Sequence, residues 1–524
     1  MHLGRLDRWR LCLIIFGVAY GCILAIDLSA NSMLWDEVTH FTGGLLLSRG
    51  QIGMWVWTNS FYPPVYDIFV SLYFLLGGGS VFAARLVSVT FSVLSLFVIY
   101  EIAKQLYNKK TGLVSAILFS VMPGIVWLSR LAMIETMLIF VLSVSMLFFF
   151  RWLQTDRKRD YAISIATFAI GAAVKYQVLV VVPLIMLLSM YFWKRNYLKA
   201  QLKSLIRPLR ITIVVAAIAV VAAIFYELST SGLLSLLIFS IREGTQQKAV
   251  YSVMYPAPIF YLVSMTWFDS VTHPISLLLY GAGIAGLGLM AARRKREDMF
   301  LLLWFIVVYV VFTLIPNKDW RYVTIAFPVL AIAASSILLV AFEEILKIGR
   351  KTMSLSRKWG TKIAAALLIV FVATGVFYSC TDAYNMVIQS QVQVPVDKAT
   401  YYVAQSLGQN QSVVVACPLN RFNQYMVWFY LYLKNPNQNY SEIWQYPAQA
   451  VDAYTEDFNV SQFILLCQQN NAKYVMLYEF GDSQYFNSAL TALTICSMLN
   501  QTGQFIPAAT FGNQPNRIFV FSFT

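Results

Sequence analysis

The stretch Trp35-Asp36-Glu37-Val38-Thr39-His40 follows shortly after the first long apolar run of the chain, residues 11–30. It places two adjacent carboxylates and an imidazole at the mouth of a predicted membrane span. If a helix starts near Asp36, His40 lies one turn further on, over the same face as Asp36 and Glu37. Polar groups beside a bilayer are often functional, and only 12% of the residues are charged. The cluster is therefore a candidate for chemistry, and the simpler interpretation is a solvated acidic loop.

The composition predicts an integral membrane protein. Of the 524 residues 59% are hydrophobic and 15% aromatic, and the mean hydropathy is +0.64. A single soluble core of this size and apolarity is implausible. The net charge of +14 does not indicate nucleic-acid binding, because the basic residues stand in short clusters between apolar runs. That arrangement is the positive-inside pattern of membrane proteins.

The apolar runs predict about eleven transmembrane helices. The first, 11–30, is preceded by Arg5, Arg8 and Arg10 and lacks a small-residue cleavage site, so we interpret it as a retained anchor. The predicted spans are 11–30, 80–103, 112–128, 135–150, a hairpin of two over 161–193, 211–228, 274–291, 299–315, 322–342 and 362–380. The apolar segment 65–76 is too short to cross a bilayer, and we expect a helix lying at the membrane interface in the first outer loop.

The distribution of Lys and Arg predicts the orientation. Of the 39 basic residues, 26 lie in clusters that fall on one side of the membrane, 8 lie in loops and span ends on the other side, and 5 lie in the tail after residue 380. This skew predicts a cytoplasmic amino terminus and an extracytoplasmic Asp36. The expected domains are a membrane core over 1–380 and an extracytoplasmic domain over 381–524.

The tail differs from the core in composition, being polar, rich in Gln, Asn and Tyr, and poor in charge. Short β-type runs occur at 412–416, 473–478 and 517–523, and helix-like runs at 400–407 and 425–433. They predict a small α/β domain. Because the tail is expected outside the cytoplasm, a disulfide among Cys380, Cys417, Cys467 and Cys496 is conceivable, and the sequence does not determine a pairing.

The other charged residues on the predicted outer face are few. Glu135 stands at the start of a span, where a carboxylate is also favoured by the helix dipole alone. Lys175 lies deep in the 161–193 hairpin, where a lysine needs a partner or reaches for the interface. Lys318, Asp319 and Arg321 precede the span 322–342, and a plain turn with a basic flank explains them equally well. Together these charged residues favour a reaction that transfers a group from a lipid phosphate. The cations would hold the phosphate, and a carboxylate would accept a proton.

The chain resembles the GT-C class of integral-membrane glycosyltransferases, which use polyprenyl-phosphate sugars, and within it the protein O-mannosyltransferases and the aminoarabinose-transferase-like members. The resemblance covers residues 11–340. It is carried by Trp35-Asp36-Glu37, Phe61-Tyr62-Pro63-Pro64, Ala84-Arg85-Leu86, the stretch from Arg130 to Glu135, Val174-Lys175-Tyr176, and Arg321-Tyr322 with Pro328.

The resemblance implies a helical membrane core with an outward-facing active site. Asp36 matches the catalytic acidic residue of the family, Glu135 its second acidic position, and Glu37 is the alternative base. The aminoarabinose-transferase-like members have a lysine where this chain has Pro63, and this departure leaves the contact to the donor phosphate open. Lys175, Lys318 and Arg321 are the candidates to replace that lysine. The expected substrate-binding residues are His40, Tyr62, Arg85, Arg130, Lys175, Lys318, Arg321 and Tyr322.

The predicted activity is transfer of a sugar, such as mannose, from a polyprenyl or dolichyl phosphate to an extracytoplasmic protein, glycan or lipid. No metal is strictly required, although Asp36, Glu37 and His40 offer oxygen and nitrogen ligands to a divalent ion. A transporter or flippase of lipid-linked sugars is the alternative, but it should show repeats and mid-membrane charges. A catalytically inactive scaffold is a second alternative.

Overall fold

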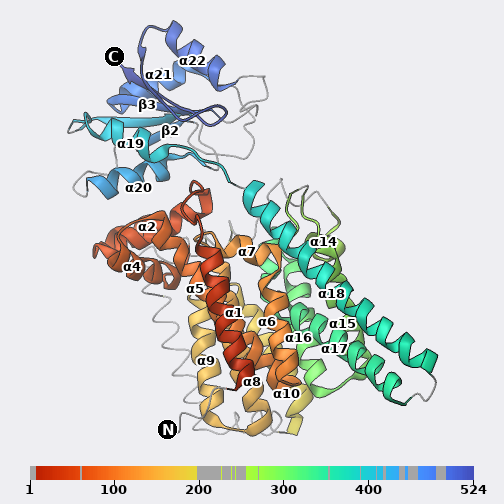
Figure 1. Cartoon of the computed structure of the whole chain (residues 1–524). Coiled ribbons are helices and arrows are strands. Elements are labelled where there is room, and N and C mark those ends of the chain that lie inside the picture. Colours follow the sequence, from red (N-terminus) through yellow and green to blue (C-terminus); the bar gives the residue numbers. More distant parts are fainter. Residues whose placement is uncertain are drawn as a thin grey trace. The chain divides into compact units, whose positions relative to one another are not determined.

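The structure of the chain is a computed structural model. It describes residues 7–59, 62–196, 255–269, 271–351, 355–389, 391–408, 410–416, 421–435, 443–446, 458–479 and 491–524, and three single residues, 226, 238 and 242. The described part forms two compact units (Figure 1). The first comprises Met1–Ile26, Ser60–Tyr66 and Leu86–Ile388, and the second comprises Asp27–Asn59, Asp67–Arg85 and Gln389–Thr524. The second unit thus combines the tail with most of residues 27–85, which we expected on the outer side and call the first outer loop.

The first unit is helical. Its described elements are α1 (Arg8–Ala25), α5 (Val81–Leu106, counted here from Leu86), α6 (Lys109–Ser120), α7 (Pro123–Ser129), α8 (Ile134–Thr155), α9 (Lys158–Ala172), α10 (Val178–Trp193), α14 (Ala257–Ser264), α15 (Leu277–Arg293), α16 (Arg296–Leu314), the 3-10 helix η1 (Trp320–Ala326), α17 (Phe327–Lys351) and α18 (Leu355–Gln389). Long apolar runs become helices here because a helix satisfies its own backbone hydrogen bonds in hydrocarbon.

Six helices of the described part are long and apolar enough to cross a membrane, or seven if the bent pair of α6 and α7 is one span. The chain is therefore a multi-pass membrane protein, while the expected count of eleven is not confirmed. The predicted span 211–228 lies outside the described residues. The predicted span 112–128 is not one straight helix, because its two halves meet at 68°, where Pro123 begins the second helix.

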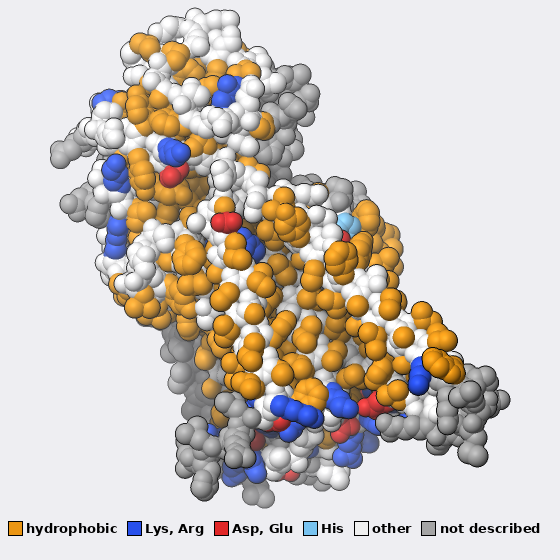
Figure 2. All heavy atoms as spheres, in the orientation of Figure 1, with side chains coloured by type: hydrophobic (Ala, Val, Ile, Leu, Met, Phe, Trp, Pro, Cys, Tyr) orange, Lys and Arg blue, Asp and Glu red, His pale blue; other side chains and the backbone are white. Residues whose placement is uncertain are grey.

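The ends of the helices carry the charge pattern that the sequence predicts. Hydrophobic side chains cover most of the visible face of the helical unit, and Lys and Arg gather along its lower edge (Figure 2). Glu101 of α5 pairs with Arg10 of α1, Lys104 of α5 and Arg151 of α8. Three basic clusters that are far apart in the sequence therefore lie at the same end of the helices.

The second unit contains three helices of the first outer loop and a five-stranded sheet. Its elements are α2 (Trp35–Ser48), α3 (Ile52–Asn59), α4 (Val65–Gly77, counted here from Asp67), α19 (Val396–Ala404), β1 (Ser412–Ala416), α20 (Gln424–Lys434), β2 (Ile443–Tyr446), α21 (Val460–Gln469), β3 (Ala472–Tyr478), α22 (Ala492–Gln501), β4 (Phe505–Phe511) and β5 (Ile518–Phe523). The predicted α/β tail is confirmed, and 65–76 is a helix as expected.

The sheet has the order β2-β1-β3-β5-β4. The strands β2, β1 and β3 run parallel, and β5 pairs antiparallel with β3 and β4. Parallel neighbours need a crossover, and α20 and α21 provide the two that join β1, β2 and β3. Helices cover both faces of the sheet, α21 and α22 on one and α19 and α20 on the other (Figure 1). Every residue of β1 is buried as a result.

The buried cysteines of the tail belong to this core. Cys467 and Cys496 pack with Val475, Leu477 and Phe505, and both are free thiols. Burial raises the pKa of each thiol to about 12. Cys380 is free as well, so the cysteines of the described residues form no disulfide, and Cys417 lies outside them.

Within the second unit the first outer loop packs on α20. Phe41 of α2 meets Phe429 edge-on, with ring centroids 5.5 Å apart. Arg49, at the end of α2, donates to the carbonyl oxygens of Tyr432 and Leu433 at 2.8 and 3.3 Å. A cation at the carboxyl end of a helix satisfies its last carbonyls and complements its dipole. The loop helix that carries Asp36 is thereby joined to the tail.

Close packing of α15 on α17 leads to a testable prediction. A Cβ added to Gly286 of α15 would lie 2.1 Å from the carbonyl oxygen of Ala333, whereas a Cβ on Gly288 meets nothing within 4 Å. Overpacking of this kind costs about 1–3 kcal/mol, while a helical Gly→Ala change without a clash stabilises by about 0.5–1 kcal/mol. We expect Gly286→Ala to lower the melting temperature of the detergent-solubilised protein and Gly288→Ala to leave it equal or higher. Equal melting temperatures for the two variants would contradict this packing.

Candidate active site

The predicted cluster lies at the amino end of α2, and its two carboxylates are in different environments. Asp36 is half-buried in the first turn of the helix, while Glu37 is fully buried. The Glu37 carboxylate accepts from the backbone N–H of Leu34 at 3.0 Å. This bond fixes the start of the helix, and the negative charge of the first turn suits the helix dipole.

Arg85 holds Glu37 in a bidentate ion pair. Its Nε donates to Oε1 and its Nη2 to Oε2, both at 2.8 Å, and both side chains are 0% exposed. The remaining donors go to the carbonyl oxygens of Leu28, Asn31 and Ser32 at 2.9, 2.8 and 3.2 Å. A guanidinium has five N–H donors, and this set of acceptors occupies all of them. Arg85, which we expected to bind substrate, therefore organises the loop that precedes α2.

Arg421 of the tail contacts the same turn, residues 28–32, to which Arg85 donates. Its Nη1 donates to the side chain of Asn31 at 2.9 Å and to the carbonyl oxygen of Ser32 at 3.0 Å. Burial lowers the pKa of Arg421, an effect that the nearby Glu37 carboxylate partly offsets. No local sequence pattern indicates this contact, because residues 31 and 421 are far apart in the chain.

His40 belongs to a second buried network. Its Nδ1 lies 2.8 Å from Oδ1 of Asp67 in α4, and Trp55 of α3 donates from Nε1 to Oδ2 of the same carboxylate at 2.8 Å. Asp67 is 0% exposed and His40 2%. The three helices of the first outer loop thus meet at Asp67. Sequence reasoning missed this residue, although a lone carboxylate in an apolar helix is itself a signal.

These contacts bear on the metal alternative. Glu37 is engaged by Arg85 and His40 by Asp67, so two of the three expected ligands already have protein partners. Across the described part of the chain, no three His, Cys, Asp or Glu side chains group as ligands of a metal ion. The residues present do not fit a divalent ion, and no step below uses one.

The other expected residues lie in the first unit, around the start of α8. Lys175 occupies the turn between α9 and α10, as the predicted hairpin requires, and its Nζ lies 3.2 Å from Oε1 of Glu135. The same Nζ stands 5.0 Å from the centre of the Tyr322 ring. The Tyr322 hydroxyl accepts from the side chain of Asn317 at 2.8 Å. The structure thus brings Glu135, Lys175 and Tyr322 together from three separate segments.

Arg321 and Lys318 differ in what they can offer a ligand. Arg321 pairs with Asp319, its Nε donating to Oδ2 at 2.8 Å, and its side chain remains 23% exposed. Lys318 donates to three carbonyl oxygens at the end of α16, those of Phe312, Thr313 and Ile315, at 3.0, 2.6 and 2.6 Å. These bonds use all three ammonium donors, and burial lowers the pKa of Lys318. Lys318 therefore serves as a helix cap.

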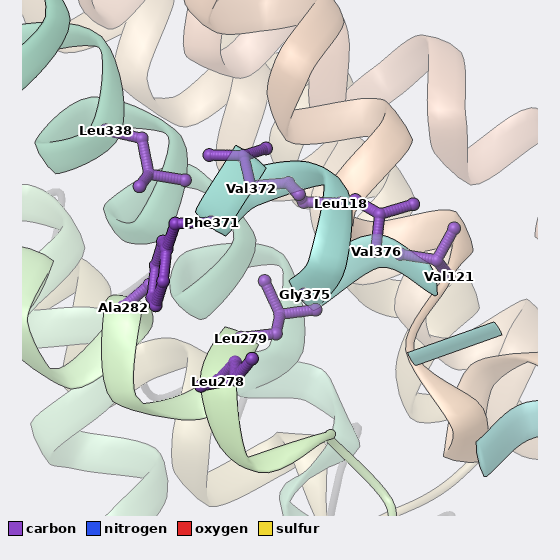
Figure 3. A pocket seen from close by; sticks show the side chains of 10 residues that line it. All are labelled: Leu118, Val121, Leu278, Leu279, Ala282, Leu338, Phe371, Val372, Gly375 and Val376. Atoms are coloured by element: carbon purple, nitrogen blue, oxygen red, sulfur yellow. The ribbon is translucent and has the colours of Figure 1, made fainter. Parts of the chain in front are cut away.

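Two further expected residues also lie in the first unit. Arg130 ends α7 and donates to the carbonyl oxygen of Leu24 near the end of α1 at 2.7 Å. Tyr62 is half-buried in the turn before α4. A hollow between α6, α15, α17 and α18 is lined only by apolar side chains, among them Leu118, Leu279 and Phe371 (Figure 3). It contains none of the expected site residues.

Comparisons with known proteins agree with this architecture. The family model of dolichyl-phosphate-mannose-protein mannosyltransferases matches residues 62–226, which is less than half of the chain. The structure is similar to ArnT from Cupriavidus metallidurans bound to undecaprenyl phosphate, with a TM-score of 0.62 and 13% identity over 97% of both chains. In fold, the chain therefore resembles membrane glycosyltransferases of the GT-C class.

Two other solved structures are similar over most of this chain. The oligosaccharyltransferase AglB from Archaeoglobus fulgidus, in complex with an inhibitory peptide and a dolichol-phosphate, has a TM-score of 0.53 and 14% identity over 88% of this chain and 69% of that one. The mycobacterial arabinofuranosyltransferase AftD has a TM-score of 0.51 and 13% identity over 99% of this chain and 42% of that one. A comparison with curated protein sequences found no match. The resemblance to GT-C enzymes of the protein-mannosyltransferase and ArnT type is confirmed.

The Glu37–Arg85 pair gives a prediction for stability. Removing one partner of a buried ion pair leaves the other charge uncompensated and typically costs about 3–5 kcal/mol. We expect Glu37→Gln to lower the melting temperature strongly and to reduce the yield of monodisperse protein. The matched control is Glu344→Gln, which breaks the exposed pair with Lys347 and should change neither quantity. A Glu37→Gln protein as stable as the parent would exclude a structural role for this pair.

Proposed function

We propose that the chain transfers a sugar, such as mannose, from a polyprenyl or dolichyl phosphate to a hydroxyl of a protein, glycan or lipid outside the cytoplasm. The observation that carries the proposal is the fold, which matches ArnT bound to undecaprenyl phosphate along nearly the whole of both chains. The AglB complex with a dolichol-phosphate supports the same class of donor.

The reaction needs one base and a cationic phosphate site. The acceptor oxygen attacks the anomeric carbon and gives its proton to a carboxylate, while the carbon–oxygen bond to the phosphate breaks. The bonding electron pair stays on the phosphate oxygen, so a monoanionic diester becomes a monoester with a second ionisable oxygen. A phosphate is a good leaving group, so a general acid is not required. Attack from the face opposite to the phosphate inverts the anomeric configuration.

Asp36 is the residue we propose as the base. It shares the first turn of α2 with Glu37, but Glu37 has both oxygens on Arg85, whereas Asp36 keeps part of its surface accessible. Glu37 and His40 then act by holding α2 in place, through Arg85 and Asp67. The partly exposed Trp35 meets Tyr425 of the tail at a ring-centroid distance of 6.1 Å. This aromatic pair stands next to Asp36 in the sequence and suits contact with a sugar or acceptor.

Arg321 and Lys175 are the residues we propose for the donor phosphate. Arg321 has a planar fork that grips two phosphate oxygens and a partly exposed side chain. The Nζ of Lys175 lies 5.0 Å from the centre of the ring of Tyr322, which is the residue next to Arg321 in the sequence. Lys318 and Arg85 have their donors occupied by protein oxygens and take no part in this proposal.

The proposed base is tested by Asp36→Asn, which keeps the size of the side chain and removes its ability to accept a proton. Loss of a general base typically lowers the rate by about 10²–10⁴-fold. The matched control is Asp397→Asn, because Asp397 is also a half-buried aspartate in the first turn of a helix of the same unit. We expect a large loss of turnover for Asp36→Asn, none for Asp397→Asn, and unchanged melting temperatures for both. Near-parental turnover of Asp36→Asn would rule out its role as base.

The activity itself is tested with purified protein and a panel of radiolabelled polyprenyl-phosphate sugars. Cleavage of one donor, with transfer of the label to an acceptor or to water, is the expected result. In proteoliposomes, movement of intact donor between leaflets without cleavage would favour the transporter alternative instead. An inert protein in both assays would exclude both.

The orientation remains a proposal: a cytoplasmic amino terminus, a membrane core over 1–380 and an extracytoplasmic domain over 381–524. The skew of basic residues toward one side supports it. Protease added to right-side-out vesicles should therefore remove the tail and leave the basic loops intact. Disruption of the vesicles with detergent provides the control for protected sites. A tail that is cut only after disruption would reverse the orientation and place Asp36 in the cytoplasm.

A further inference from the structure

Glu135 is the least firmly held of the carboxylates that pair with the expected phosphate-binding cations. Glu37 accepts two bonds at 2.8 Å from Arg85 and one from a backbone N–H. Asp319 accepts from the side chain and the backbone N–H of Arg321, both at 2.8 Å. Glu135 accepts a single side-chain hydrogen bond, at 3.2 Å from Lys175, and its Oε2 is buried without a hydrogen-bond partner among the described residues. A buried charged oxygen without a partner is costly.

The surroundings of Glu135 favour an anion at the same place. The side chains of Glu135 and Lys175 are 5% and 9% exposed, so solvent screens the pair little. The guanidinium of Arg321 also interacts electrostatically with the Glu135 carboxylate. Lys175 thus contacts the Glu135 carboxylate directly, and Arg321 acts on it electrostatically. A phosphate brings more oxygens and, after transfer, more charge than this carboxylate does.

We infer that Glu135 is an exchangeable counter-ion of Lys175. The donor phosphate displaces Glu135 from Lys175, and Glu135 pairs with Lys175 again when the lipid phosphate product dissociates. The inference rests on the proposed function, because it assigns a role to Glu135 within that same site. It goes beyond the family resemblance, which implies only that Glu135 matches the second acidic position of the family. Glu135 then limits the affinity for phosphate, and it limits it most for the product, whose phosphate carries the larger charge.

This exchange solves a physical problem of the reaction. The phosphate gains negative charge when the sugar leaves, so a site that stabilises the transition state also binds the product more tightly than the donor. A carboxylate that competes for Lys175 offsets the extra attraction. Without it, the lipid phosphate would dissociate slowly and release would limit the rate, as is common in enzymes.

The experiment compares Glu135→Gln with the parent, with Glu101→Gln as the matched control. Glu101 is another carboxylate of the helical unit that pairs with a lysine, but it belongs to the cluster of Arg10, Lys104 and Arg151. Binding of undecaprenyl phosphate and of inorganic phosphate is measured in detergent. We expect Glu135→Gln to bind both about tenfold more tightly, and Glu101→Gln to bind them like the parent. A shift of the same size for both probes assigns the effect to the phosphate group rather than to the prenyl chain.

Turnover provides the second measurement. With a donor that the parent cleaves, Glu135→Gln should complete its first turnover at a near-parental rate and then slow down, because product release has become limiting. Unchanged binding with loss of the first turnover would make Glu135 a catalytic residue and overturn the inference. Weaker binding of both probes would also overturn it, since Glu135 would then orient Lys175. If the parent itself binds no undecaprenyl phosphate and cleaves no donor, the proposed function fails as well.

Discussion

The buried ion pair between Glu37 and Arg85 is the interaction on which the candidate site depends. Arg85 gives two donors to Glu37 and the others to carbonyl oxygens of the turn at 28–32. This one guanidinium therefore fixes both the start of α2 and the path of the chain that leads to it. Burying two charges is favourable only when geometry is good and every donor is satisfied, and this pair meets both conditions. Asp36 directly precedes Glu37 in the same helical turn, so the ion pair of Glu37 also fixes the position of Asp36.

A second constraint concerns the cations. Each basic residue considered for the donor phosphate has a protein partner within its own unit: Glu37 for Arg85, Glu135 for Lys175, Asp319 for Arg321, and three carbonyl oxygens for Lys318. An unpaired charge at the edge of hydrocarbon would be costly. A phosphate site in such a protein is consequently one that is neutral before the ligand arrives. Binding then exchanges one anion for another, and the affinity depends on how firmly the resident carboxylate is held.

Within the second unit, residues of the tail contact the first outer loop and help to position the helix that carries Asp36. Arg49 caps α20, Phe41 packs on Phe429, and Arg421 reaches Asn31. The tail is therefore more than an appended domain, because its residues help to hold the loop helix that carries Asp36. The mixed sheet behind α20 supplies a rigid support, since helices cover both of its faces and β1 is buried throughout.

The sequence by itself determined the features that depend on local pattern. Apolar runs and basic clusters predicted the membrane helices, and the strands at 412–416, 473–478 and 517–523 followed from their β-branched and aromatic residues. It also indicated Asp36, Glu135, Lys175 and Arg321, because charge is rare in this chain. Only the tertiary structure decided which of these groups are paired. It also decided the partners of other polar residues: Asp67 contacts His40, Arg421 contacts Asn31, and Lys318 caps α16. The first two of these contacts join residues that are distant in the sequence. A side chain's partner, and therefore its chemical role, is set by the packing of whole helices, which no local pattern records.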